Sequence, residues 1–208
     1  MAKLLLALIA SLMVASCTAV RTNVAVTHTL PASASSRTVA ILPYTEGLAA
    51  APEFRAYAAK LAAHLRAEGY DVVEPAGGRV PDYLAFFSFH IDDGTAVTRL
   101  ASTPHPFTGS IITYGYRTAF SASTRRIYSR TVMLDILDRA RFRPNEPASF
   151  VAARLYSGSV LSEGSCPSLD RVIDPMLAAL FADFPGASGQ LRAVDIPSES
   201  ACGLDRFG

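Results

Sequence analysis

The spacing of apolar residues predicts a helix between two strands in the region after residue 37. Thr38–Pro43 is short, apolar and rich in β-branched residues, which is typical of a buried strand. Pro52 falls near the first turn of the expected helix, and Gly69 stands where such a helix ends. Residues 70–74 have the pattern of a second strand, so we expect 38–74 to be a β-α-β unit with parallel strands and a right-handed crossover. The apolar face of the helix recurs at steps of three and four residues and consists of Phe54, Tyr57, Ala58, Leu61, Ala62 and Leu65.

Apolar and polar residues alternate in several later segments, which predicts further strands. Residues 82–92 alternate most clearly, with Tyr83, Ala85, Phe87, Phe89 and Ile91 expected to face the core. Residues 111–120 and 127–137 are predicted to be paired strands joined by 121–126, after a loop at 94–109. Strands at about 150–161 and at 191–196 would complete an antiparallel meander.

The last apolar stripe at helical spacing runs from Leu169 to Phe181, and Ser168 is a candidate N-cap for this helix. Pro175 leaves two alternatives open. Either it kinks the helix, or Asp174 caps a shorter helix that starts at Pro175.

These elements predict an α/β (α+β) fold, a two-layer sandwich of a mixed, largely antiparallel sheet with two helices packed on one face. The other face of the sheet would carry Leu84, Phe86, Tyr128, Val132 and Leu134. Such a face is too apolar to be freely solvated, so either loops of the same chain cover it, or the N-terminal segment, a partner or a bound lipid does.

The N-terminus predicts export. Lys3 is followed by a mostly apolar run from Leu4 to Ala15, and its 12 residues fall short of the ~20 that a spanning helix needs. Val14-Ala15-Ser16-Cys17 resembles the bacterial lipobox, in which the cysteine thiol is diacylated before cleavage. Several acyl chains at ~0.8 kcal/mol per buried methylene would anchor the chain stably. The alternative is an ordinary secretory signal in which Cys17 is incidental.

The expected organisation is therefore a lipoprotein signal peptide at 1–16, a lipidated N-terminus and tether at 17–37, in which Val24–His28 could pair as an edge strand, and a single periplasmic domain at 38–208. Thr18, in place of an aspartate after the cysteine, resembles the sorting signal for the outer membrane. The chain would then be anchored by lipid at the periplasmic face of that membrane.

Charge and cysteine content agree with this prediction. The chain has 19 Lys and Arg against 18 Asp and Glu, which argues against a nucleic-acid partner, so the expected membrane attachment is the covalent lipid. With Cys17 lipidated, Cys166 and Cys202 remain as a pair in an oxidising compartment, and a disulfide between them would close a loop of about 36 residues. Two free thiols or a metal site are the alternatives.

Few residues are candidates for chemistry or binding. His90 and Asp92 lie on one face of an expected strand, where with Asp93 they could supply ligands to a metal; the other interpretation is a strand end that turns at Asp93-Gly94. Arg139, Arg141 and Arg143 alternate beside a loop, where they could bind a carboxylate or phosphate or be solvated. We expect no cofactor, no resident metal and no catalytic residues, and the remaining ligand or interaction candidate is Phe86 on the outer sheet face.

Three segments together resemble lipoproteins that contain domain of unknown function 4136: Glu68-Gly69-Tyr70 after the helix, Pro81-Asp82-Tyr83-Leu84 entering a strand, and the ending from Leu177 to Gly186. The resemblance implies a fold and brings no catalytic residues. The expected function is a non-enzymatic binding or assembly module of the envelope, with a protein or peptidoglycan partner. The rival hypothesis is a periplasmic hydrolase or metal-dependent enzyme that uses His90 and Asp92. A third hypothesis is a lipid or small-ligand carrier, which requires a cavity between the sheet and the helices.

Overall fold

The computed structural model describes residues 18–31, 37–75, 77–108 and 114–198. In this part of the chain, eight strands form one mixed sheet in the order β3-β2-β4-β6-β7-β1-β8, and β5 pairs with β6 outside that order. The strands are β1 (Thr18–His28), β2 (Thr38–Pro43), β3 (Asp71–Val72), β4 (Tyr83–Ile91), β5 (Thr95–Thr108), β6 (Tyr114–Asp138), β7 (Arg154–Gly164) and β8 (Gln190–Ser198). The helices are α2 (Pro52–Ala67), α3 (Pro147–Ala153) and α4 (Ile173–Phe181), with a 3-10 turn η2 (Glu46–Leu48).

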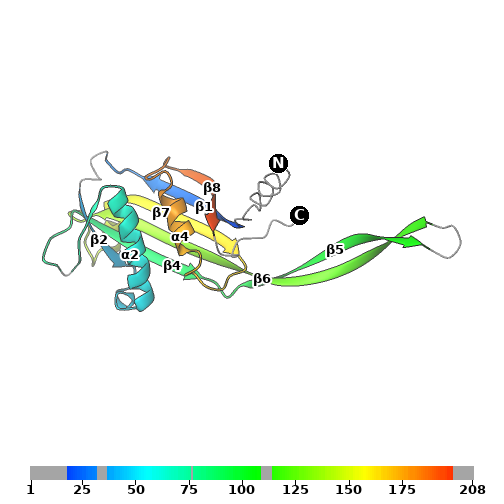
Figure 1. The fold of residues 1–208 in the computed structure, drawn as a ribbon. Coiled ribbons are helices and arrows are strands. Elements are labelled where there is room, and N and C mark those ends of the chain that lie inside the picture. Colours follow the sequence, from blue (N-terminus) through cyan, green and yellow to red (C-terminus); the bar gives the residue numbers. More distant parts are fainter. Residues whose placement is uncertain (1–17, 32–36, 76, 109–113, 199–208) are drawn as a thin grey trace, which may run out of the picture.

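Helices α2 and α4 pack against each other on one face of the sheet, so the α+β sandwich with two helices on one face is confirmed (Figure 1). The β-α-β unit is also confirmed, because β2 is parallel to β3. Helix α2 starts with Pro52 and buries Phe54, Tyr57, Leu61, Ala62 and Leu65. Gly69 has φ 88° just after the helix, a conformation that glycine adopts at little cost.

Strand β1 corrects the expected tether. Residues 22–28 pair with β7 and residues 18–26 pair with β8, so β1 lies inside the sheet and is not an edge strand; the edge strand on this side of the sheet is β8. Val20, Val24 and Val26 alternate with exposed residues and enter the core. The folded part therefore begins no later than Thr18, in place of the expected Thr38.

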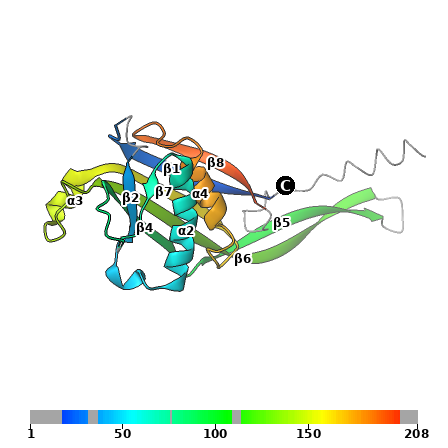
Figure 2. The same cartoon turned by 60° about the vertical axis from the view of Figure 1, so that its left-hand side comes forward.

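Strands β5 and β6 correct the expected hairpin. Residues 95–108 form a strand where a loop was expected, and residues 114–138 are one continuous strand. The segment 121–126, expected as a connection, lies inside β6. Strand β5 pairs with β6 from Thr95, which lies opposite Ile127, to Thr108, which lies opposite Tyr114. The two strands form a long arm that projects beyond the sheet (Figures 1 and 2).

The segment after β6 also differs from the prediction. Helix α3 occupies the start of the expected strand at 150–161, and β7 begins only at Arg154. Helix α4 begins at Ile173 with Val172 as N-cap, so neither Ser168 nor Asp174 caps it. Pro175 lies in its first turn, where a missing N–H leaves no helical hydrogen bond unmade.

The main core lies between the sheet and helices α2 and α4, and a smaller cluster lies on the opposite face. Leu84 and Phe86 face outward as expected, but Val132 and Leu134 face the helices, fully buried in the main core. Tyr128 shares the helix side with them by strand alternation. On the outer face, Phe142 and Phe150 pack over the part of the sheet formed by β2, β4 and β6. Phe142 lies in the loop after β6 and Phe150 lies in α3, so two segments of the same chain cover part of this face.

Candidate functional site

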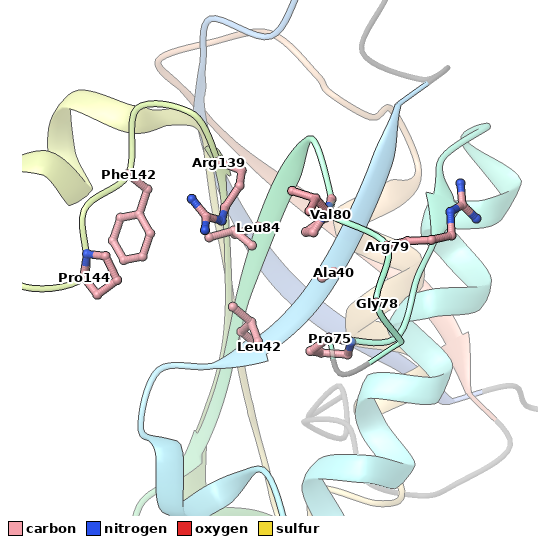
Figure 3. A pocket seen from close by; sticks show the side chains of 11 residues that line it. Ala40, Leu42, Pro75, Gly78, Arg79, Val80, Leu84, Arg139, Phe142 and Pro144 are labelled. Carbon is pink, nitrogen blue, oxygen red and sulfur yellow. The ribbon is translucent and has the colours of Figure 1, made fainter.

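A pocket of about 420 Å³ lies on the outer face of the sheet, beside the edge formed by β2 and β3. Its volume falls within the range of small-molecule sites. Four parts of the chain meet there: strand β2, strand β4, the connection before β4, and the segment that follows β6 (Figure 3). The lining consists of Ala40, Leu42 and Leu84 from the strands, Pro75, Gly78, Arg79, Val80 and Pro81 from the connection, and Arg139, Phe142 and Pro144 from the last segment.

The floor and one wall of the pocket are apolar. Leu84 and Ala40 are buried in the smaller cluster, and Leu42 and Phe142 pack against it. Val80 stands at the mouth with 80 % of its surface exposed. Prolines at 75, 81 and 144 set the path of the two connections, because each restricts its own backbone and that of the preceding residue. The result is an apolar hollow with a large exposed side chain at its rim.

Two arginines line this pocket, and their surroundings differ. Arg79 Nη2 lies 2.8 Å from a carboxylate oxygen of Asp71, so an acidic neighbour balances its charge. The Arg139 backbone N–H donates to the carbonyl of Asp82 at 3.0 Å, which fixes the residue at the end of β6. Its exposed side chain lies beside Leu84 and Phe142, and no salt bridge in the described part of the chain involves it (Figure 3). A cation at the mouth of an apolar hollow fits a ligand that is apolar with an anionic group.

A buried carboxylate lies on the same outer face of the sheet, paired with Phe86 of β4. Asp135 is 3 % exposed, accepts a hydrogen bond from the Tyr44 hydroxyl, and lies 3.9 Å from Arg154 Nη1. Burial, and then the hydrogen bond to Asp135, raise the pKa of Tyr44, so this hydroxyl stays a proton donor. Tyr44 also contacts the rings of Phe86 and Phe150. Asp135 is therefore held by its neighbours and is not directed into the pocket lining.

His90 and Asp92 do not form a site in this structure. His90 is exposed at a position paired with Thr131 on the outer face. One carboxylate oxygen of Asp92 accepts the backbone N–H groups of Gly94 at 3.1 Å and Ser129 at 2.9 Å, which makes it a turn residue. Within the described ranges, no three His, Cys, Asp or Glu side chains gather where they could hold one metal ion.

The other candidates fall in different places. Arg139 lines the pocket, Phe86 belongs to the aromatic cluster beside it, and Arg141 is exposed and outside the lining. Cys166 is 9 % exposed and disulfide-bonded, but both other cysteines lie outside the described residues. The pairing of Cys166 with Cys202, and the lipidation of Cys17, therefore stay predictions.

Sequence reasoning missed the connection at 75–81, which supplies nearly half of the lining. Its sequence Pro75-Ala-Gly-Gly-Arg-Val-Pro81 indicates only a turn-rich loop. Val80, the one large apolar side chain in a stretch of Pro, Gly, Ala and Arg, was the one available signal.

A polar row crosses three neighbouring strands on the helix side of the sheet. Thr22, Ser162 and Arg130 are paired in register on β1, β7 and β6, and all three are buried. Arg130 Nη2 donates to Ser162 Oγ at 3.2 Å, whereas Nε and Nη1 have no hydrogen-bond partner in the structure as described. Burial lowers the pKa of Arg130. Because two donors have no partner, this guanidinium is a cost to folding.

Comparisons with known proteins leave the family open. No family model matches the chain, and no curated protein matches it. Among solved structures, a PDZ domain protein from Parabacteroides distasonis ATCC 8503 aligns with a TM-score of 0.47 and 12 % identity over 85 % of this chain. The alignment covers 39 % of that protein, so the chain spans about two fifths of its length. A similarity this low carries no argument about function. Among the described residues, no helix is long and apolar enough to span a bilayer.

Proposed function

We propose that this chain is a lipoprotein of the bacterial envelope, fastened through Cys17 at the periplasmic face of the outer membrane, and that its folded domain is a non-enzymatic binding module. The lipobox-like Val14-Ala15-Ser16-Cys17 supports the anchor. The resemblance of three segments to lipoproteins with domain of unknown function 4136 is part of the same proposal. A Cys166–Cys202 disulfide would tie the C-terminal segment to the domain.

The pocket is the observation that carries the binding role. Its floor is apolar, Val80 is exposed at its mouth, and Arg139 adds a positive charge that no acidic residue of the described chain balances through a salt bridge. An apolar hollow with one charged group is the usual composition of a ligand site. We assign the pocket to a ligand, or to a segment of an envelope partner, that combines an apolar group with a carboxylate, sulfonate or phosphate.

Titration with anilinonaphthalene sulfonate, an anionic aromatic probe whose fluorescence rises in apolar surroundings, tests this assignment. Arg139→Gln and Val80→Ser are each expected to weaken probe binding at least about tenfold, since a charge-assisted hydrogen bond to the probe, or burial of Val80 by the probe, would contribute about 1.5–3 kcal/mol.

Two matched controls separate the pocket from the rest of the surface. Arg141→Gln removes the same charge two residues away from Arg139, and Leu191→Ser removes an exposed apolar side chain on β8. Both should bind the probe as the unchanged chain does. If all four variants bind it equally, the pocket is not the site and the binding role loses its support.

A further inference from the structure

The arm formed by β5 and the first part of β6 is the largest feature that the pocket leaves unexplained. We define it as residues 95–108 and 114–127, which pair only with each other in the described chain. The arm projects away from the helices and from the rest of the sheet (Figures 1 and 2). At ~3.3 Å per residue, a strand of this length extends about 45 Å.

The arm receives little support from the fold. Side chains 95–102 and 121–126 are exposed, and Leu100 has 76 % of its surface in solvent. A two-stranded ribbon alone in water is marginally stable, and both of its edges present unpaired backbone groups. An arm of this length is therefore expected to be held by something outside the described chain.

The charge of the arm indicates what that partner is. No Asp or Glu occurs between Gly94 and Leu134, whereas the arm carries Arg99, Arg117, Arg125 and Arg126. The other 15 Lys and Arg of the chain stand against all 18 Asp and Glu, so the rest of the molecule is slightly acidic. This arrangement attracts an anionic surface to the arm and not to the body.

The position of the arm in the fold favours a bilayer as that surface. Register pairs Tyr128 with Gly164 and Thr22 with Ser162, so the first residues of β1 lie at the sheet end from which the arm leaves (Figure 1). Thr18, the first residue of β1, directly follows Cys17. If Cys17 carries lipid, as the proposed function holds, the anchor and the root of the arm share one end of the sheet.

We propose that the arm is a membrane-contacting element that binds anionic phospholipid headgroups through its arginines, with Leu100 in the interfacial region of the lipid. It holds the anchored domain in a fixed orientation, and the pocket then lies at the opposite end of the sheet, where β6 ends. A second copy of the chain is a poor partner for the arm, because pairing two such arms brings like charges together.

Vesicle sedimentation with residues 17–208 carrying Cys17→Ser tests the arm without any contribution from lipidation. The chain should sediment with phosphatidylcholine vesicles that contain phosphatidylglycerol, stay in solution with phosphatidylcholine alone, and be released by high salt. The double variant Arg99→Gln/Arg125→Gln should bind about thirtyfold more weakly, because each arginine near an anionic surface is worth about fivefold. Leu100→Ser should also weaken binding.

The matched control is Arg66→Gln/Arg141→Gln, which removes two exposed arginines at the other end of the sheet and should bind within about twofold of the unchanged chain. The proposal is overturned if the unchanged chain ignores the anionic vesicles, or if both double variants lose binding equally. It is also overturned if ultracentrifugation shows that the arm instead pairs copies of the chain, or if crosslinking in envelopes joins it to an acidic protein. The Cys17→Ser chain cannot be lipidated. Failure of this chain to bind vesicles would therefore not contradict the proposed lipid anchor, and failure to find the anchor would not change the vesicle result.

Discussion

Replacing Arg130 by methionine is expected to stabilise the fold, although it removes a residue from the middle of the sheet. Arg130 is 0 % exposed, and Nε and Nη1 have no partner in the described structure. Its one hydrogen bond, to Ser162, is 3.2 Å long. Methionine has a similar length and can fill the same space without polar groups.

The expected gain follows from what is lost and what is relieved. An unsatisfied buried donor costs about 1–3 kcal/mol, and the hydrogen bond to Ser162 contributes about 1.5–3 kcal/mol at most. Arg130→Met removes two unsatisfied buried donors and loses one hydrogen bond. The net gain in the free energy of unfolding is therefore about 2 kcal/mol. For a domain of this size, that gain raises Tm by about 4–8 °C.

Urea unfolding followed by far-ultraviolet circular dichroism measures the effect, with Arg126→Met as the control for loss of one positive charge at an exposed position. Arg130→Met should raise the urea midpoint without a change of slope, and Arg126→Met should leave it nearly unchanged. A loss of about 1 kcal/mol or more in Arg130→Met would refute the reasoning, because it would mean that the guanidinium has a strong partner beyond the described residues.

Three further substitutions test the packing and the electrostatics. Gly158→Ala should lower stability by about 1–3 kcal/mol in urea unfolding, because the new Cβ would lie 2.5 Å from Tyr156 Oη and 2.8 Å from Leu180 Cδ1; an unchanged midpoint would contradict this packing. Tyr44→Phe removes the donor to Asp135 and should cost about 1–3 kcal/mol, seen as a lower Tm, whereas an equal Tm would mean that water replaces the hydroxyl. Hydrogen bonds from the backbone N–H and the hydroxyl of Thr38 lower the pKa of Asp82. The stability advantage of the unchanged chain over Asp82→Asn should therefore be complete above the ordinary carboxyl pKa and fade as the pH falls through the lowered value. Urea midpoints at about pH 6 and about pH 3 measure this, and a constant difference between them would refute it.

Periodic segments with one buried face could be predicted from the sequence. The stripe of α2 and its terminal Gly69 lie as expected, and the core side of β4 has Tyr83, Ala85 and Phe87 buried. The parallel β2–β3 pair also follows from the β-α-β pattern. In each case the period of the pattern matched the geometry of the element.

The features that could not be predicted lack such a pattern or contain a misleading one. In the arm, the side chains of residues 95–102 are all exposed, so the sequence there has no alternation of apolar and polar residues that would indicate a strand. Pro104 and Pro106 indicated a loop instead. In β1 the alternation of Val20, Val24 and Val26 was present, but its Thr- and Ala-rich composition favoured a tether. The pocket depends on the connection at 75–81 meeting Arg139 across the sheet, a contact between distant segments that no local pattern contains.

The anchor at Cys17 is the claim on which the orientation of the molecule depends. The direct measurement expresses the full chain and its Cys17→Ser variant in a Gram-negative host, washes the membranes with high salt and alkaline carbonate to remove arm-mediated binding, and determines the mass of the N-terminal peptide. The unchanged chain should stay in the washed membranes with a peptide that begins at Cys17 and carries acyl chains, and the variant should be released. A variant retained as firmly as the unchanged chain, or an unmodified Cys17, would contradict the proposal.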